Sequence, residues 1–422
     1  MKTEQHILLG FKPSPIGPIP NDWEVKELGG LGEFSKGKGI LKEQVIEKGL
    51  PCIRYGEIYT THDFVIKEFK SFISEEAARE SQEIFKGDIL FAGSGETIEE
   101  IGKAVAFIGD EKAYAGGDVI ILSSNRNVNS ECLSYALETD VTKKQKRKIG
   151  QGHSIVHIYP NELAKIKLPL PPLSEQTAIA NCLSTWDNAI SAVNSIISKK
   201  ELRKKWLMQQ LLTGKKRLPG FNGEWELVKI NSLAIEVSLK NPDNQKLVVL
   251  SCTKHDGLIP SLEYFGRKIF SNNLTTYKQV PKAHFAYATN HIEEGSIGYQ
   301  NIFDNALISP MYTVFKTNYI VNDDFLYMVL KTYNYILEYQ KRMEGSINRR
   351  GGLRWDEFSK IKVDLPPIEE QTAIARVLKK ADKEIQLLKS KIEKLKQQKK
   401  GLMQVLLTGK KRLMVMPENV NP

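Results

Sequence analysis

The sequence is poor in cysteine, and its four cysteines lie far apart. Cys52, Cys132, Cys182 and Cys252 form no CxxC pair, so neither a zinc cage nor a redox-active dithiol is indicated. No apolar stretch approaches the ~20 residues that a membrane-spanning helix needs, and the first fifteen residues contain too short an apolar run for a signal peptide. We therefore expect a cytoplasmic protein with no membrane association and no metal site.

Complete catalytic motifs are also missing. Residues 91–95 read FAGSG and match the FxGxG loop of S-adenosylmethionine-binding methyltransferases, but the [ND]PP[YF] tetrapeptide of such enzymes is absent. Residues 32–39 resemble a phosphate-binding loop, yet Gly39 stands where Ser or Thr must reach magnesium. No HExxH, GxSxG or PD…ExK arrangement occurs. The sequence predicts a chain that is not itself an enzyme, with a stand-alone methyltransferase or nuclease as the alternative.

The composition allows several domains and favours a polyanionic partner. The 422 residues are 41% hydrophobic and carry 60 Lys and Arg against 50 Asp and Glu, a net charge of +10. This length is typical of about two to four domains. The positive balance favours nucleic acid first and an anionic membrane second, while a slightly basic protein without such a partner is the simpler reading.

The most informative feature is an internal repeat. Residues 165–218 recur at residues 360–413 without a gap, and more than half of the aligned positions are identical. The regions that precede the two copies barely match. Two similar segments and two dissimilar ones indicate one scaffold that presents two different binding surfaces.

Each repeat predicts a long helix. The proline pairs at 171–172 and 366–367 suit a helix start, and Gly214 and Gly409 suit a helix end. Apolar residues alternate with a spacing of four and three, a 3.5-residue period that indicates a coiled coil. Only Lys399 interrupts this period in the second copy, and the first copy loses phase near Lys200.

The two helices could pair with each other in an antiparallel manner, or pair with partner helices, or lie buried in one globular core. The residues that we expect to mediate helix pairing are Ile179, Leu183, Trp186 and Ile190 in the first helix, and Ile374, Leu378, Ile385, Leu388 and Ile392 in the second.

The unlike segments predict two globular domains. Residues 21–164 (domain 1) and 219–359 (domain 2) begin with the related stretches NDWEVKEL and GEWELVKI. Short apolar runs broken by Gly, Asn and Asp predict strands, and residues 130–147 and 325–343 predict helices. We expect a mixed α/β or α+β fold with a pseudo-twofold repeat: segment 1–20, domain 1, helix region 165–218, domain 2, helix region 360–413 and tail 414–422.

Candidate DNA contacts cluster near the end of each domain. Gly-rich loops that carry Arg and Asn can approach a phosphate backbone or reach base edges, although a solubilising loop is the alternative. In domain 1 the cluster is Lys143, Lys144, Lys146, Arg147, Lys148 and His153. In domain 2 it is Asn348, Arg349, Arg350 and Arg354. The turn with Ser94, Glu96 and Thr97 adds a third candidate.

At LPLPPLSEQTAIA and DLPPIEEQTAIA, each closing in LLTGKKRL, the chain resembles the specificity subunit of type I DNA restriction-modification systems. The resemblance covers nearly the whole chain, in the order recognition domain, spacer helix, recognition domain, spacer helix. The stretch 87–104 is similar to a recurrent strand-turn-strand of such domains, whereas domain 2 departs from it at 284–301.

This resemblance implies a non-catalytic subunit. Each domain would read one part of a bipartite target in double-stranded DNA, and the paired helices would fix the spacing. Two modification subunits would supply S-adenosylmethionine and the methyltransferase site, and restriction subunits would supply ATP- and Mg-dependent translocation and the nuclease. A coiled-coil scaffold whose domains bind proteins is the competing hypothesis.

Overall fold

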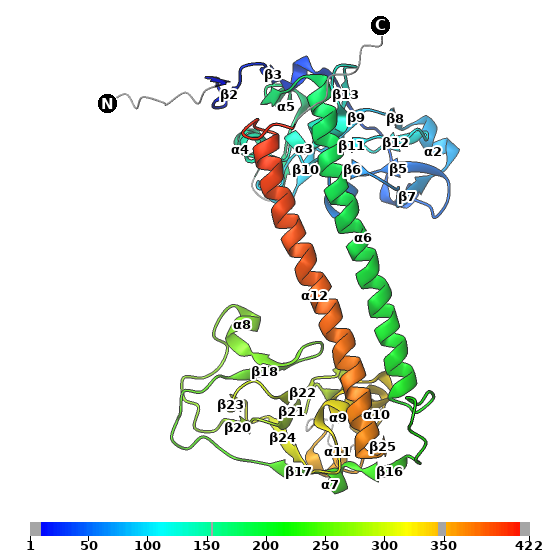
Figure 1. The fold of residues 1–422 in the computed structure, drawn as a ribbon, viewed down its shortest axis with the longest axis vertical. Helices are drawn as coiled ribbons and strands as arrows, with labels where there is room; N and C mark the ends of the chain where they lie inside the picture. The colour runs from blue at the N-terminus through cyan, green and yellow to red at the C-terminus, as the bar shows by residue number, and fades with distance from the viewer. Residues whose placement is uncertain (1–9, 153–154, 345–351, 414–422) are drawn as a thin grey trace. The chain divides into compact units, whose positions relative to one another are not determined.

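A computed structural model describes residues 10–152, 155–344 and 352–413 (Figure 1). The chain divides into two compact units: residues 1–194 with 390–422 (unit 1), and residues 195–389 (unit 2). Each unit therefore combines one globular domain with a part of both repeat regions. Across the described ranges, no helix is long and apolar enough to cross a membrane.

Two β-sheets form the body of domain 1. A five-stranded sheet has the order β4-β13-β9-β11-β6 and a four-stranded sheet has the order β7-β5-β12-β8. In that order, the strands of the first sheet are Gly32–Lys36, Val119–Ser124, Asp88–Ala92, Ala104–Phe107 and Val65–Ile66. Those of the second sheet are Ser71–Ile73, Leu50–Ile53, Ala113–Ala115 and Gln82–Ile84. Four shorter strands lie outside these sheets: β1 (Phe11–Lys12), β2 (Ile19–Pro20), β10 (Ser94–Gly95) and β14 (Val156–His157).

Domain 2 repeats part of this topology. Its four-stranded sheet β17-β24-β21-β22 has the same order and antiparallel pairing as β4-β13-β9-β11. Its strands are Ala234–Val237, Tyr312–Thr317, His284–Ala288 and Ile297–Gln300. Two further antiparallel pairs are the hairpin of β18 (Leu250–Thr253) with β19 (Gly257–Pro260), and β20 (Lys278–Pro281) with β23 (Asn305–Ile308), between which β21 and β22 lie in the chain. The central strands β9 and β21 are buried along their whole length.

The related WEV and WEL stretches form equivalent strands. In domain 1, β3 (Glu24–Glu27) pairs with β15 (Lys167–Leu170), the strand that leads into the first long helix. In domain 2, β16 (Glu226–Lys229) pairs with β25 (Lys362–Leu365), which leads into the second. The repeat therefore begins with a strand pair that attaches each helix to the start of its own domain.

Ten short α-helices lie among the described residues of the two units. Unit 1 contains α1 (Tyr55–Thr60), α2 (Glu75–Arg79), α3 (Ser130–Ala136), α4 (Asp140–Ile149) and α5 (Pro160–Leu163), and unit 2 contains α7 (Ile230–Leu233), α8 (Ser261–Phe265), α9 (Asp323–Leu330), α10 (Tyr333–Glu344) and α11 (Trp355–Phe358). The single helices predicted at 130–147 and 325–343 were wrong, because each is two helices. Thr139 and Thr332 mark the breaks: their hydroxyls donate to carbonyls of the preceding turn, Ala136 O at 2.9 Å and Val329 O at 2.8 Å.

The two predicted long helices are confirmed. They are α6 (Leu173–Leu211) and α12 (Ile368–Leu406), each of 39 residues. Within each unit the two run antiparallel. In unit 1 Asp187 pairs with Lys399 at 2.5 Å, and in unit 2 Lys200 pairs with Glu384 at 2.7 Å and Lys204 pairs with Asp382. Figure 1 shows the α6 and α12 segments side by side within unit 1.

Most of the expected helix-pairing side chains are buried, and the outermost ones belong to the domain cores. Ile179 and Leu183 lie in the core cluster of domain 1 with Met403 and Leu406 of α12. Ile374 and Leu378 lie in that of domain 2 with Leu211 of α6. Nearer the middle of the helices, Ile190, Ile385 and Ile392 are buried, while Trp186 and Leu388 are half-buried. The ends of both helices are thus parts of the globular domains.

Lys399 interrupts the apolar spacing because it pairs with a charge inside unit 1. Its side chain is 5% exposed, and its ammonium group lies 3.8 Å from the Phe64 ring centroid and 4.7 Å from that of Tyr135. Tyr135 also donates a 2.6 Å hydrogen bond to Asp187. Burial lowers the pKa of Lys399, although the hydrogen bond to Asp187 opposes this shift. One lysine thereby ties α12 to both α6 and α3.

A second contact joins the repeats crosswise, and we call it the carboxylate clamp. Arg412, from the end of the second repeat, donates to both carboxylate oxygens of Glu175 at the start of the first, at 2.5 and 2.7 Å. Arg217, from the end of the first repeat, likewise binds Glu370 at the start of the second. The side chains of Glu175 and Glu370 are 4% and 0% exposed. Each arginine also lies over a tryptophan ring, Trp23 or Trp225.

The glutamine that follows each of these glutamates binds the N-cap residue of a helix in its own domain. Gln176 Oε1 accepts from the backbone N–H of Asn129, the N-cap of α3, and Gln371 Oε1 accepts from that of Asn322, the N-cap of α9, both at 2.8 Å. Their amide nitrogens donate to Pro171 O and Pro366 O. The repeated PPxxEQ motif is therefore a docking element: its glutamate pairs with the end of the other repeat, and its glutamine binds the N-cap of a helix in its own domain.

We predict that Arg412→Ala lowers the stability of unit 1 by about 3 kcal/mol, because it leaves the buried carboxylate of Glu175 without its counter-ion. Chemical denaturation followed by Trp fluorescence measures the loss. The matched control is Lys411→Ala at the exposed neighbouring position, which should change stability by less than about 0.5 kcal/mol. Glu175→Gln combined with Arg412→Ala should recover part of the loss. Equal stability of the two single variants would contradict the clamp.

Candidate nucleic-acid interface

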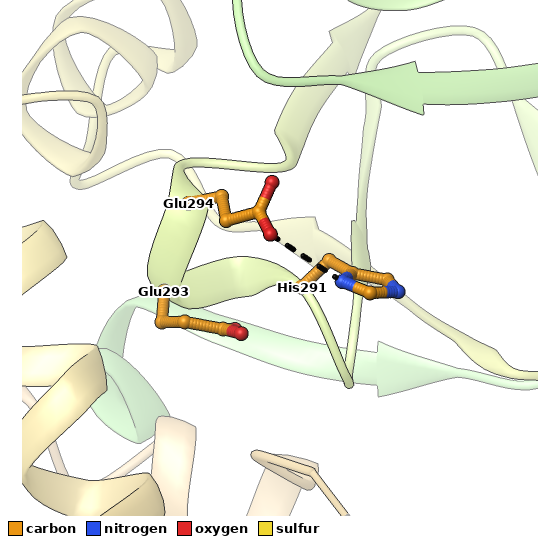
Figure 2. Close-up of side chains that lie close together, drawn as sticks. All are labelled: His291, Glu293 and Glu294. Atoms are coloured by element: carbon orange, nitrogen blue, oxygen red, sulfur yellow. Dashed lines mark ion pairs between the residues drawn. The ribbon is translucent and has the colours of Figure 1, made fainter.

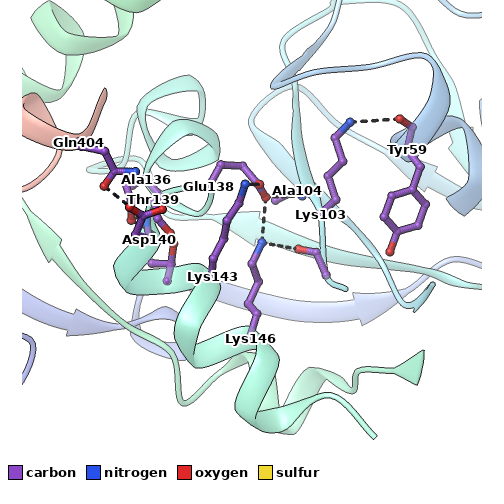
Figure 3. Close-up of polar contacts among 12 residues, drawn as sticks. Tyr59, Lys103, Ala104, Ala136, Glu138, Thr139, Asp140, Lys143, Lys146 and Gln404 are labelled. Carbon is purple, nitrogen blue, oxygen red and sulfur yellow. Dashed lines mark hydrogen bonds and ion pairs between the residues drawn. The ribbon is translucent and has the colours of Figure 1, made fainter. Parts of the chain in front are cut away.

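Helix α4 carries the basic cluster of domain 1. Lys144, Arg147 and Lys148 are exposed on its surface. Lys143 is 38% exposed and forms a 3.1 Å ion pair with Glu138. Figure 3 shows Lys143 and Lys146 of α4 reaching toward Glu138, which lies just before the helix. The three exposed side chains can neutralise phosphates, and DNA contact by Lys144, Arg147 and Lys148 remains a prediction.

Lys146 must be removed from the predicted DNA contacts. Its side chain is 3% exposed, and its ammonium group donates to Glu138 at 2.8 Å and to Gly102 O at 2.9 Å. Burial lowers the pKa of Lys146 and by itself would raise that of Glu138, but Lys146 and Lys143 outweigh this effect and lower the pKa of the carboxyl. Lys146 therefore joins α4 to the domain interior, which the lysine-rich sequence could not reveal.

Of the residues predicted to contact DNA from the turn of domain 1, one is also buried and two are exposed. Ser94 lies in β10 and is 6% exposed, and its hydroxyl contacts Nδ1 of His157 in β14 at 3.0 Å. Its side chain therefore faces a neighbouring strand. Glu96 and Thr97 are exposed directly after β10. His153 lies outside the described residues, as do Asn348, Arg349 and Arg350 of domain 2.

Arg354 is exposed at the rim of an open hollow in domain 2. The hollow has a volume of about 460 Å³, and its lining includes Lys278, Thr289, Asn290 and Tyr312 from the central sheet region, with Arg354 and Trp355 at the start of α11. Lys278 donates a 2.7 Å hydrogen bond to Tyr312 O. Within the described part of the chain, the Arg354 guanidinium has no ion-pair or hydrogen-bond partner.

Next to this hollow, a short turn brings one imidazole and two carboxylates together. His291, Glu293 and Glu294 have potential ligand atoms within 4.8 Å of one another (Figure 2). His291 and Glu294 form an ion pair at 3.7 Å, with side chains 67% and 56% exposed. Because this exposure leaves His291 and Glu294 hydrated, these two side chains are explained as a surface ion pair. The expectation of no metal site is not tested by it.

Sequence inspection missed the residues of domain 2 that correspond to the turn of domain 1. Both domains contain F-A, five variable residues and I-E-E: Phe91 to Glu100 in domain 1 and Phe285 to Glu294 in domain 2. In both, the motif begins in the central strand, β9 or β21, and the chain then returns in its antiparallel neighbour, β11 or β22. This constant spacing could have identified residues 287–291 as the counterpart of residues 93–97.

The family follows from a comparison with known sequences. Two parts of the chain, residues 20–204 and 222–397, match the model of the type I restriction modification DNA specificity domain. Together these matches cover most of the sequence. The chain therefore belongs to the type I restriction-modification specificity family and carries two copies of its DNA specificity domain, as the repeated sheets and clamps had indicated.

Full-length relatives agree with this assignment. Two proteins of Methanocaldococcus jannaschii assigned as type I restriction enzyme specificity subunits, MjaX and MjaVIII, are 29% and 26% identical to this chain. The alignments cover 96% and 94% of this chain and 97% and 94% of the relatives. The specificity subunit of the type I restriction enzyme EcoKI from Escherichia coli is 25% identical over 40% of this chain and 37% of its own length.

Solved structures share the fold. The S subunit of a type I restriction-modification system from M. genitalium has a TM-score of 0.56 at 15% identity, with 96% of this chain and 98% of that one covered. A chain from a study of complex assembly and conformational transition of the type I R-M system has a TM-score of 0.58 at 16% identity, with 93% and 99% covered. The mixed α/β fold with two long helices is thus confirmed.

We predict that substitutions of neighbouring residues of α4 affect different properties, DNA binding in one case and stability in the other. Lys144→Ala and Arg147→Ala should weaken DNA binding for all sequences and reduce the salt slope of the affinity by about 1 each, because each removes one phosphate contact. Lys146→Ala should instead destabilise domain 1, since it leaves the buried Glu138 with the partly exposed Lys143 as its remaining cation. Binding titrations at several salt concentrations and thermal unfolding separate the two classes. A reduced salt slope in a stably folded Lys146→Ala protein would contradict the correction.

Proposed function

We propose that this chain is the DNA-reading subunit of a type I restriction-modification complex, in which domain 1 and domain 2 each bind one part of a bipartite duplex target. The observation that carries the proposal is a contrast within the chain. The two domains share a sheet order, helix breaks and a carboxylate clamp, whereas the sequences of their loops and basic clusters differ. A repeated scaffold with two different surfaces suits a protein that reads two different sequences.

The physical division of labour follows from DNA chemistry. Phosphate contacts by exposed Lys and Arg supply affinity and register but carry no sequence information. A few base-edge contacts in each half supply discrimination. When a fixed spacer joins two such readers, binding of the first half raises the effective concentration of the second. Two modest readings then become one specific event, provided that the spacing is correct.

We propose further that the chain catalyses nothing itself. Modification subunits would dock on the helices and nearby surfaces and would bring S-adenosylmethionine and the methyltransferase site, and restriction subunits would bring ATP- and Mg-dependent activity. The incomplete FAGSG and glycine-rich motifs support this: Phe91 and Ala92 lie buried in β9, and Gly95 belongs to the strand pair β10-β14. These residues serve the sheet.

The test combines two measurements. With a modification subunit present, DNA affinity should fall steeply, by about 10³-fold or more between low and physiological salt if six or more phosphates are contacted. A flat response would favour a scaffold that binds proteins. The purified chain alone should not bind S-adenosylmethionine, and saturable micromolar binding would show that the chain carries its own cofactor site.

The spacing function makes a separate prediction. Seven residues inserted in both helices, between Lys200 and Glu201 and between Lys383 and Glu384, keep the 3.5-residue phase and the pairing. They add about 10 Å of helix, which corresponds to about three base pairs. Methylome sequencing should show a target spacer longer by about three base pairs. As a control, a seven-residue insertion after the exposed Asp110 should leave the target spacer unchanged. If the spacer is unchanged in both variants, the two long helices do not set the spacing of the target.

A further inference from the structure

We infer that the hollow around Asn290 is the site at which domain 2 reads a base edge, with Asn290 as the residue that selects adenine. This inference rests on the proposed function and adds a residue that the sequence pattern alone did not single out. It begins from the equivalence of the two domains: Asn290 and His291 occupy the positions of Glu96 and Thr97 in the shared FA-x5-IEE segment. The scaffold is the same, and the functional groups that it presents differ.

The neighbouring backbone holds Asn290 in place. The N–H of Leu353 donates to Thr289 O at 2.9 Å, and Thr289 Oγ1 donates to Met311 O at 3.0 Å and lies 3.3 Å from Asn290 Oδ1. Gly352 has a φ of +63°, and a Cβ there would lie 2.4 Å from both Asn290 Oδ1 and Thr289 O. Only glycine allows this close approach, so the chain is built to pass directly over the asparagine.

The free groups of the hollow define its ligand. Among the described residues, the Asn290 amide nitrogen has no hydrogen-bond partner, and the side chain is half-buried. A carboxamide offers one donor and one acceptor, which is the pattern that matches N7 and N6 of adenine in the major groove. At the rim, Met311 is 64% exposed and can contact the methyl group of the paired thymine.

The charges of the hollow distinguish a base edge from a phosphate. Glu236 and Asp356 also line it and offset the positive charges of Lys278 and Arg354. The hollow therefore has no net positive charge to attract a phosphate, and its carboxylates can accept from the N–H groups that base edges present. Arg354 lies at the rim without a partner among the described residues and is exposed. We assign Arg354 to the adjacent backbone phosphate, which positions the DNA while Asn290 selects the base.

The test uses the assembled complex with its modification subunits and a panel of duplexes that vary one base pair at a time. Asn290→Ala should reduce discrimination roughly ten- to hundredfold at one A·T pair in one half-site and leave the other half-site unchanged. The isosteric Asn290→Asp should shift the preference at that position from adenine toward cytosine, because a carboxylate accepts from cytosine N4. Arg354→Ala should weaken binding about equally for all sequences and lower the salt slope by about 1.

Asn301→Ala, at an exposed asparagine after β22, is the matched control and should change no position. Since Asn290→Asp preserves size and shape, it keeps the test valid if the alanine variant folds poorly. The inference is overturned if both Asn290 variants leave every position intact, or weaken both half-sites equally. The proposed function fails separately, and visibly, if the wild-type complex shows no sequence preference in either half.

Discussion

A carboxylate removed from water needs a counter-ion, and this requirement organises the whole chain. Glu175 and Glu370 stand at the starts of the two long helices, buried against their domains. Each finds its arginine at the end of the other repeat, Arg412 or Arg217. Because an unpaired buried charge costs several kcal/mol, neither helix start can dock until the far end of the opposite repeat has arrived. The clamps therefore make each repeat depend on the other.

The same constraint explains where the two halves of the chain are free to differ. Residues of the clamps, of the glutamine ties to Asn129 and Asn322, and of the central strands have their contacts fixed by the interior. In the turns after β9 and β21, Glu96, Thr97 and His291 are exposed and Asn290 is half-buried at a surface hollow, so the interior does not fix the identity of these side chains. Domain 1 presents Glu96 and Thr97 there, and domain 2 presents Asn290 and His291. An interior that is duplicated and a surface that is not allow each domain to acquire its own target.

The 3.5-residue apolar period and the internal repeat were sufficient to predict the two long helices and the two domains. The 3.5-residue spacing and the flanking Pro and Gly predicted α6 and α12 closely, since both signals are local in sequence. The breaks at Thr139 and Thr332 were missed because a hydroxyl that bonds to a carbonyl leaves no trace in apolar spacing. The role of Lys399 was hidden for a related reason: its partners, Asp187, Phe64 and Tyr135, come from three distant segments.

For the candidate interface, charge density was an incomplete guide. Of five basic residues between 143 and 148, Lys146 points inward and Lys143 is paired with Glu138, because a ten-residue helix must turn one face to the domain. The shared FA-x5-IEE spacing aligns Asn290 with Glu96, but it does not show that Asn290 lines a hollow. Its importance depends on Gly352, which is distant in sequence and whose missing side chain makes room for it.

The crosswise contacts also impose an order on how the protein is made. The core of domain 1 contains Ile19 and Trp23 from the start of the chain, and Met403, Leu406 and Leu407 from near its end. Unit 2, by contrast, is one continuous stretch of residues 195–389. As the ribosome releases the chain from its amino terminus, domain 2 has all its core residues before domain 1 does. The domain synthesised first is thus the last to close, and its incomplete core stays exposed for most of translation.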